Sequence, residues 1–374
     1  MHILQYIYYS PFYIFLGFVI PVFHQCYSQN IHPRPENSPD ARVVSEILYQ
    51  VDIKSISKDL RDYKDFFQSG QTTDTIGARS GPEGSIIGDV TAATIVDSSI
   101  LVLDQEYGEV KRYSINGTYK GAFGRPGTGP GELATPRDFD VGPNGAVWVL
   151  DADRTISVFN RTDTGYVSTK TFTITHHPQK IESCNGKVYV YGDSPGTSAS
   201  HSQVTTIHEY SVSGSHIRSF GPYYQSNQIT LSRSLSKASG FECLSGRHLF
   251  VDYRYLPYSI LVGIDNKRNE WKIRYNRQKT IDVRMTRSNG NPEVRFSSPD
   301  EGTTVGTSSS VIESKYVVVN KRTKDFFEVY IADIDSKKAL KVGDYEEEWL
   351  YVDDDLSLRS VEVPYPIIKI IKFD

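Results

Sequence analysis

Short apolar runs recur along most of this chain, and their spacing limits the folds that it can adopt. They are rich in Val, Ile, Tyr and Phe, and turn-forming residues bound each one, which is the pattern of β-strands rather than helices. The runs are Ile100–Leu103, Val147–Leu150, Val188–Tyr191, Leu249–Val251, Tyr316–Val319 and Trp349–Val352. Their recurrence indicates an array of similar β units, with insertions where the interval lengthens.

Two neighbouring units each contain four expected strands. The clearer unit has them at Arg137–Val141, Ala146–Leu150, Ile156–Asn160 and Thr169–Ile174. The preceding unit has them at Val90–Ile95, Ile100–Leu103, Val110–Tyr113 and Tyr119–Phe123. Tight turns such as Asn116-Gly117 join them. A unit of four strands that repeats every ~40–50 residues is typical of one β-propeller blade. We therefore predict an all-β propeller of four-stranded antiparallel blades.

The number of blades follows from how the ring closes. Five units are visible, and the last unit, from Trp349 to Phe373, is one strand short. The run Val43–Ile53 would supply that strand, so that N- and C-terminal strands close the ring and leave no open sheet edge. This predicts six blades, or seven if a weak blade lies near Val283–Phe296. Only Ser57–Phe67 has the composition of a helix or polar lead-in.

The N-terminal segment indicates export. Phe12–Ile20 is uncharged and apolar, and it has the length of a signal-peptide core but is too short to span a bilayer. We expect a signal peptide at 1–28, a linker at 29–42 and the propeller at 43–374, with no membrane span after signal removal. The location would be extracytoplasmic: periplasmic, cell-surface or secreted. An uncleaved anchor, or a lipid on Cys26, is the alternative.

Composition excludes other classes of function. The hydrophobic fraction of 38% supports a sizeable core, and a net charge of −4 with no basic stripe argues against nucleic-acid binding. Cys184 and Cys243 could form a disulfide in an oxidising compartment. Because they hold equivalent places in two repeats, we favour separate, buried thiols.

One loop carries a family resemblance. Gly124–Glu132 reads GRPGTGPGE, and Pro136, Asp140, Gly145 and the VWVLD run follow it. This resembles the NHL-repeat pattern, in particular that of bacterial exported six-bladed propellers, and the match is strong over about residues 86–160. The resemblance implies a blade-connecting loop. The loop's glycines would also allow an anion-binding nest of backbone amides.

An Asp or Asn follows most of the apolar runs, where the turn between the second and third strands is expected. These residues are Asp104, Asp151, Asp153, Asp193, Asp252, Asn320 and Asp353–Asp355. We expect side-chain capping of tight turns. The alternative is a functional one, in which these carboxylates form a ring that binds Ca²⁺. The metal candidates are Asp104, Asp151, His176 and His177.

The adjacent pair His176-His177 lies on the expected crossing into the third blade. Either imidazole could bind Zn²⁺ or act as a base, but neighbours in extended chain point in opposite directions and do not readily share one ion. Basic residues on the same face could grip a carboxylate or phosphate. The ligand-binding candidates are Arg125, Arg137, Asp151, Asp153, Arg154, Asp252 and Arg254.

These features favour a binding module for a protein, peptide or glycan on the loop-rich face. The alternative is a metal-assisted lyase or hydrolase, like the lactonases and amidating lyases among related propellers, with a site in the central channel. A structural module of a larger assembly is a third hypothesis. Neither a nucleophile elbow nor a zinc-protease motif occurs in the sequence.

Overall fold

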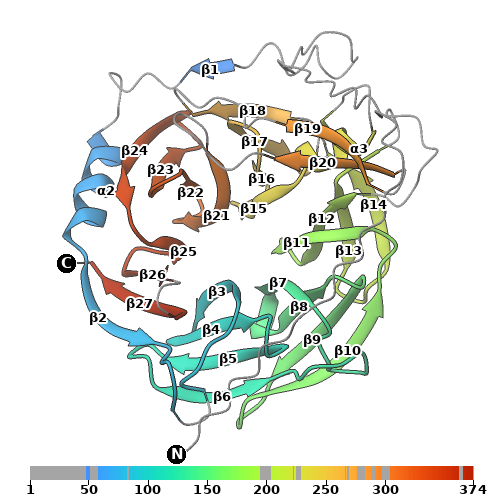
Figure 1. Ribbon diagram of the computed structural model, residues 1–374, viewed down its shortest axis with the longest axis vertical. Helices are drawn as coiled ribbons and strands as arrows, with labels where there is room; N and C mark the ends of the chain where they lie inside the picture. Colours follow the sequence, from blue (N-terminus) through green and yellow to red (C-terminus); the bar gives the residue numbers. More distant parts are fainter. Residues whose placement is uncertain are drawn as a thin grey trace, which may run out of the picture.

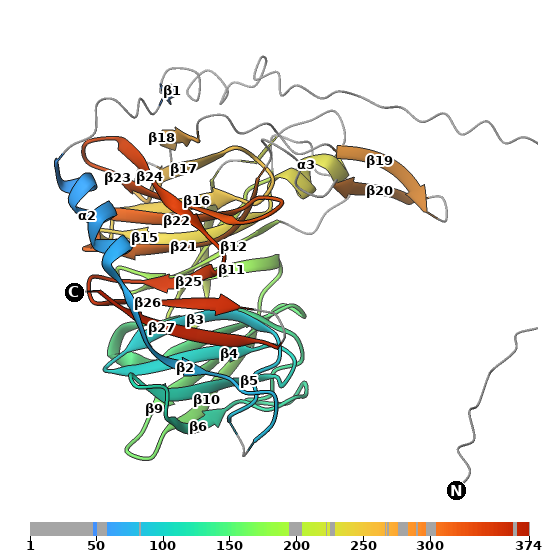
Figure 2. The same cartoon turned by 60° about the vertical axis from the view of Figure 1, so that its left-hand side comes forward.

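The computed structural model describes residues 48–50, 58–81, 84–193, 204–221, 223–224, 229–265, 267, 269–275, 283–288, 291–296, 304–361 and 365–373. Within them, six blades of four antiparallel strands surround a common centre, and one blade carries a fifth, parallel strand, as Figure 1 shows end-on and Figure 2 from the side. The predicted six-bladed β-propeller is confirmed. The proposed signal peptide and linker, with Cys26, lie outside the described residues.

Blades I to III follow the chain in order. Blade I contains β3 (Val90–Val96), β4 (Ser99–Asp104), β5 (Glu109–Ser114) and β6 (Tyr119–Phe123). Blade II contains β7 (Pro136–Val141), β8 (Val147–Asp151), β9 (Thr155–Arg161) and β10 (Tyr166–Thr173), with a 3-10 turn at Pro143–Gly145. Blade III contains β11 (His177–Cys184), β12 (Lys187–Asp193), β13 (Ile207–Ser211) and β14 (His216–Phe220).

Blades IV to VI complete the ring. Blade IV contains β15 (Ala238–Leu244), β16 (His248–Tyr253), β17 (Tyr258–Gly263) and β18 (Asn269–Arg274). Blade V contains β21 (Val305–Ile312), β22 (Tyr316–Arg322), β23 (Phe327–Asp333) and β24 (Lys338–Tyr345). Blade VI contains β25 (Glu348–Val352), β26 (Leu356–Val361), β27 (Ile367–Lys372) and, from the N-terminal side, β2 (Gln71–Ile76).

The ring closes with a different strand from the one that we expected. β2 pairs antiparallel with β27, whereas β1 (Leu48–Gln50), within the predicted Val43–Ile53, pairs parallel with β18 in blade IV. The prediction sought an apolar strand. β2 is the outermost strand of its blade, and only Ile76 of its six residues is buried. An outer strand needs little apolar surface, so hydrophobicity selected the wrong segment.

In blade VI the apolar run lies in a different strand from the one that the sequence predicted. The run Trp349–Val352 lies in β25, the innermost strand, and not in a second strand. This explains why the interval from Tyr316 to Trp349 is the shortest: it steps from a second strand to the next first strand. The seven-blade alternative is wrong, because β19 (Val283–Ser288) and β20 (Asn291–Phe296) form only a two-stranded hairpin.

The core is divided among the six interfaces between neighbouring blades. Ile100 and Val102 of β4 pack toward blade VI, and Leu101 and Leu103 pack toward blade II. All four side chains are fully buried. A second strand that is covered on both faces must be apolar at every position, which is why these strands read as continuous runs.

Two α-helices among the described residues flank the ring. The expected helix near Ser57–Phe67 is present as α2 (Lys58–Ser69), and it buries Leu60 and Phe67 against blades V and VI. A second helix, α3 (Ile229–Leu235), lies between blades III and IV. Figure 2 shows α3 beside the β19–β20 hairpin at one side of the molecule. No helix among the described residues is long and apolar enough to cross a membrane.

The two cysteines form a disulfide, so the prediction of separate thiols was wrong. Cys184 and Cys243 lie on β11 and β15, with Cα atoms 5.6 Å apart. The first strand of each blade is innermost, where neighbouring blades converge (Figure 1). Equivalent positions of consecutive repeats therefore lie side by side across the blade boundary.

Candidate functional site

Each blade is a four-stranded meander, so its first strand begins, its second strand ends, its third strand begins and its fourth strand ends at the same end of the ring. We call this end the crossing face. α3 and the β19–β20 hairpin both belong to connections on it. Residues 194–203, which connect β12 to β13, lie outside the described residues.

Two of the predicted turn aspartates accept hydrogen bonds from backbone N–H groups. Asp104 is fully buried and accepts hydrogen bonds from the N–H groups of Gly88 (2.9 Å) and Tyr107 (3.3 Å) and from Lys111 Nζ (2.7 Å). Asp151 accepts from the N–H groups of Ala134 (2.7 Å) and Thr135 (3.0 Å). Each carboxylate thus joins a turn to the segment that enters the same blade, which extends the expected turn capping.

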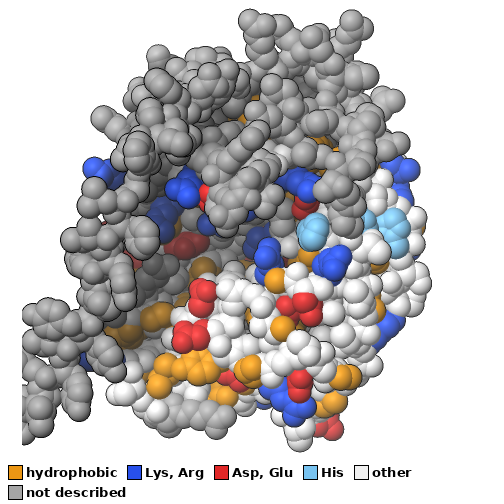
Figure 3. Space-filling view, turned by 45° about the vertical axis from the view of Figure 1, so that its right-hand side comes forward, with side chains coloured by type: hydrophobic (Ala, Val, Ile, Leu, Met, Phe, Trp, Pro, Cys, Tyr) orange, Lys and Arg blue, Asp and Glu red, His pale blue; other side chains and the backbone are white. Residues whose placement is uncertain are grey.

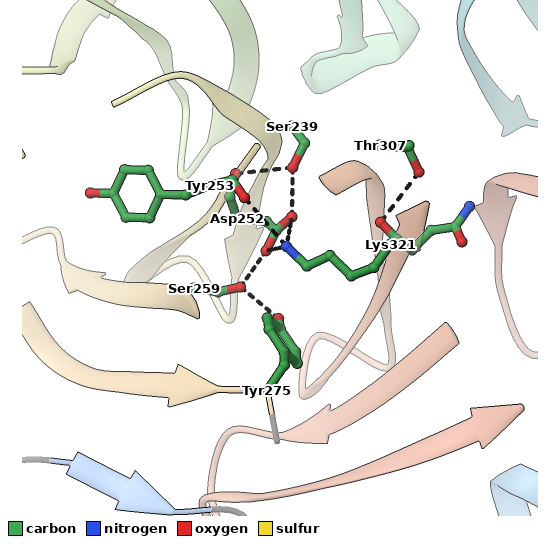
Figure 4. A network of polar contacts seen from close by, with 8 residues as sticks. Ser239, Asp252, Tyr253, Ser259, Tyr275, Thr307 and Lys321 are labelled. Atoms are coloured by element: carbon green, nitrogen blue, oxygen red, sulfur yellow. Dashed lines mark hydrogen bonds and ion pairs between the residues drawn. The ribbon is translucent and has the colours of Figure 1, made fainter. Parts of the chain in front are cut away.

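The third turn aspartate belongs to a buried network between blades IV and V (Figure 4). Lys321 from β22 donates to both carboxylate oxygens of Asp252, at 2.6 and 2.7 Å. Ser239 and Ser259 donate to the same carboxylate, each at 2.5 Å. Tyr275 contacts the Ser259 hydroxyl at 2.6 Å. With every carboxylate oxygen occupied by chain groups, this site is a cross-blade tie.

Of the other predicted turn residues, Asp153 and Asp193 have partners of their own. Asn320 lies within β22 and not in a turn, and its buried side-chain amide has no hydrogen-bond partner among the described residues. Asp153 accepts from the backbone and side chain of Thr155. Asp193 pairs with Arg233 at 3.1 Å, and burial raises its pKa. Asp353–Asp355 lies in the turn between the first and second strands of blade VI, at the opposite end of the ring, which corrects the prediction. The described structure does not gather these carboxylates into one group.

The glycine-rich loop is filled by its own glutamate. Glu132 accepts from Gly129 N–H at 2.8 Å and pairs with Arg125 at 2.8 Å. The Gly129 hydrogen bond and the Arg125 charge hold the pKa of Glu132 below its usual value. A Cβ at Gly127, where φ is 147°, would meet the Glu132 carboxylate at 2.1 Å. The predicted anion nest is therefore occupied by the chain itself.

Three cations converge on the crossing face, and we call them the cationic rim: Arg137, Lys237 and Arg254. Arg137 lies in β7, Lys237 just before β15 and Arg254 just after β16. Burial lowers the pKa of Lys237, and the charges of Arg254 and Arg137 lower it further. Arg254 N–H donates to the Lys237 carbonyl at 2.8 Å. Arg154, the other predicted cation, lies exposed in the β8–β9 turn with a φ of 74°.

Among the residues that the structure describes, none of the three cations of the cationic rim forms a salt bridge, although the Asp193 charge raises the pKa of Lys237. Arg137 contacts the Pro178 carbonyl at 3.5 Å, and Arg254 lies 5.8 Å from the Tyr255 ring. Figure 3 shows Lys and Arg side chains around a hollow on this side of the molecule. Lys237 was not among the ligand-binding residues predicted from the sequence, because nothing in its local sequence indicates that it lies near Arg137.

Acidic side chains of the innermost strands link neighbouring blades. Asp138 and Asp140 of blade II accept from the N–H groups of Ile181 (2.9 Å) and Ser183 (2.6 Å) of blade III. Glu182 accepts from Cys243 N–H at 2.9 Å, and Glu242 accepts from the Ser309 hydroxyl at 2.7 Å. The same direction, from each blade to the next, repeats through blades II to V.

Burial of these carboxyl groups disfavours their charged forms. It raises the pKa of Asp140 to about 6 and that of Glu242 to about 8. The Asp140 charge adds to the shift of Glu242, and both charges raise the pKa of Glu182. Lys180 pairs with Asp138 at 3.3 Å. The candidates named from the sequence did not include these residues, although alternation in the first strands (DFD, IES, FEC) marks their shared position.

The side chains of the adjacent residues His176 and His177 lie in different environments, as expected for neighbours in an extended chain. His177 is exposed, and His176 is buried beside two histidines of blade III, His208 and His216. The His176 and His208 rings stack with centroids 3.3 Å apart. Burial lowers the pKa of His176 to about 4 and that of His208 to about 3. Among the described residues, these three alone group His, Cys, Asp or Glu side chains closely enough to hold a metal ion.

Comparison with known proteins identifies the fold. A family model described as a 6-bladed beta-propeller matches residues 82–289. A "Putative exported protein" from Bacteroides fragilis NCTC 9343 has a similar structure, with a TM-score of 0.53 and 11% identity over 82% of this chain and 96% of that chain.

Two further solved structures are similar at the level of the fold. The structure of U3-55K has a TM-score of 0.52 and 10% identity over 81% of this chain and 100% of that one. A chain of the Mitotic Checkpoint Complex has a TM-score of 0.52 and 11% identity over 88% of this chain and 98% of its own. No curated protein matches the sequence.

Proposed function

The chain belongs to the family of six-bladed β-propellers, and from this premise we propose that it is an exported binding module whose crossing face takes an acidic group of a protein, peptide or glycan. Propellers are found in assemblies such as the Mitotic Checkpoint Complex. The apolar segment Phe12–Ile20 and the exported neighbour support export. The GRPGTGPGE loop supports the NHL type.

The observation that carries the proposal is the cationic rim. Arg137, Lys237 and Arg254 come from two blades, and the like charges of Arg254 and Arg137 add to the effect of burial in lowering the pKa of Lys237, which the Asp193 charge opposes. A carboxylate, sulfate or phosphate of a ligand would relieve that repulsion, and the two guanidinium groups provide bidentate donors for it. The connections that contain α3 and the β19–β20 hairpin supply further loop surface on the same face.

A metal-assisted lyase or hydrolase has less support. It requires metal ligands in the central channel, and the acidic groups of the innermost strands accept hydrogen bonds from the next blade. In the histidine group, His208 and His216 lie in the two outer strands of blade III, and His176 lies in the connection that enters that blade.

The test measures binding of two fluorescent acidic probes, a polyglutamate peptide and an oligogalacturonate, to the full chain. We expect binding that weakens as salt rises, and a loss of about tenfold or more, ~1.4 kcal/mol, in the variant Arg137→Ala/Lys237→Ala/Arg254→Ala. Arg161→Ala is the matched control, because Arg161 pairs with Asp97 near the opposite end of the ring. Unchanged binding of both probes by the triple variant would refute the proposal.

A further inference from the structure

Three imidazoles from separate segments meet at the outer part of blade III. His176 ends the connection from blade II, His208 lies in β13 and His216 lies in β14. One ring nitrogen from each histidine lies within 4.8 Å of one ring nitrogen of each of the other two. His176 and His208 are almost completely buried, and His216 is exposed at the surface. The group is therefore closed on one side and open on the other.

A β-bulge brings the two hairpin histidines to one face. His208 pairs with Ser219 and Tyr210 pairs with His216, and the register shifts between Glu209 and Tyr210. Without that shift, His216 and Ser219, three residues apart, would point to opposite faces of the strand. Bulges of this kind re-aim side chains at functional sites.

The Ser219 hydroxyl lies between two of the rings. Its Oγ is 2.8 Å from His208 Nδ1 and 2.9 Å from His216 Nε2. His208 Nε2 is 3.1 Å from the Gly192 carbonyl oxygen, which only accepts, so the ring proton is on Nε2. The lone pair of Nδ1 therefore points toward Ser219, at a position that a metal ion could share with His216.

The third ring has a nitrogen available as well. His176 Nδ1 is 2.8 Å from the Tyr210 hydroxyl, which leaves Nε2 for another partner. A hydrogen bond from the second ring nitrogen to a hydroxyl or a backbone carbonyl is the usual support for a metal-binding histidine. Both buried rings have such support, from Tyr210 and Gly192.

We propose that His176, His208 and His216 form a binding site for a divalent transition metal of the zinc type. Imidazole nitrogens suit Zn²⁺ and its neighbours in the transition series, and the group contains no carboxylate of the kind that Ca²⁺ or Mg²⁺ requires. Three histidines around tetrahedral zinc place their nitrogens ~3.3 Å apart, given bonds of ~2.0–2.1 Å. On metal binding, the stacked His176 and His208 rings would tilt so that their in-plane lone pairs converge. The exposed His216 ring would move inward, and the Ser219 hydroxyl would rotate away. The fourth position faces solvent.

The test uses the full chain, purified without a histidine tag and stripped of metal. Co²⁺ should produce the visible absorption of a tetrahedral nitrogen site, and Zn²⁺ should abolish it by displacement. Zinc at 100 times its Kd should raise Tm by about 4 °C. His216→Ala, which changes an exposed residue, should lose both effects. His177→Ala, the adjacent exposed histidine, is the matched control and should retain both.

Two further variants make the outcome decisive. Ser219→Ala removes the hydroxyl but no ligand, so it should bind Zn²⁺ at least as tightly as the unmodified chain. His208→Ala should lose the cobalt spectrum, and its circular dichroism shows whether it has folded. The proposal is wrong if the chain gives no cobalt spectrum, or if His177→Ala loses zinc stabilisation as fully as His216→Ala.

Discussion

At the scale of single residues, one buried ion pair, Asp252–Lys321, is completed across the boundary between two blades. Asp252 and Lys321 are 0% and 1% exposed, and they come from adjacent blades. Burial alone would favour their neutral forms, and it lowers the pKa of Lys321, which the Asp252 carboxylate opposes. Because four hydrogen bonds converge on one carboxylate (Figure 4), the pair fixes how blades IV and V align.

Lys321→Met tests this tie. The substitution leaves Asp252 buried without its cation, and we expect the free energy of unfolding to fall by about 3–5 kcal/mol. Urea denaturation measures the change. Asp252→Asn added to Lys321→Met should recover part of the loss, because no buried charge remains. The exposed pair provides the control: Arg161→Met should cost less than about 1 kcal/mol. Equal losses in the two single variants would contradict this account.

Glu242 should make stability depend on pH. Burial raises its folded pKa from 4.5 to about 8, with the Asp140 charge adding to the rise and Ser309 and Lys180 opposing it. The folded state therefore holds the proton more tightly than the unfolded state. Its contribution to stability is complete below pH 4.5 and is lost as pH rises through about 8.

Glu242→Gln replaces the titrating carboxyl group with an amide, whose carbonyl oxygen can still accept the hydrogen bond from Ser309. We expect the free energy of unfolding of the variant to rise by about 1 kcal/mol relative to that of the unmodified chain between pH 5 and pH 8.5. This is less than the free energy that corresponds to the full pKa difference, because the side chain is partly exposed. Urea midpoints at both pH values measure it. The same stability difference at the two pH values would show that Glu242 titrates normally.

At the scale of elements, how well the sequence predicts a strand depends on how much of it is buried. β4 and β8 are covered on both sides, so their apolar runs identified them correctly. β2 is mostly exposed and reads QTTDTI, so its role in closure could not be recognised from composition. The His208–His216 relation depends on a bulge, and the disulfide depends on blade order; neither is visible in local sequence.

The segment α2–β2 should be the part of the N-terminal region that stability requires. A chain that starts at residue 58 keeps Leu60, Phe67 and β2, and we expect its Tm to match that of the full chain within about 2 °C. A chain that starts at residue 78 exposes the edge of β27 and empties the packing around Trp349. It should melt at least ~5 °C lower or associate. Calorimetry with light scattering distinguishes these outcomes.

A point variant separates packing from strand loss. Phe67→Ala leaves β2 in place but removes the ring that contacts Trp349 and Phe373. We expect a loss of about 3–5 kcal/mol, or roughly 4–7 °C. If the truncated chain starting at residue 78 melted at the same temperature as the full chain, β2 would contribute nothing to closure.

At the scale of the whole molecule, the closing strands determine how the ring responds to force. β2 and β27 are antiparallel neighbours, so Gln71, where one strand begins, lies opposite Lys372, where the other ends. Tension between the segments that leave these two residues loads the sheet at one end. Its hydrogen bonds break in sequence, as in a zipper, rather than together in shear. Blade VI would therefore open at low force while the other five blades remain intact. The β2–β27 pair would be the first part of the ring to separate under tension.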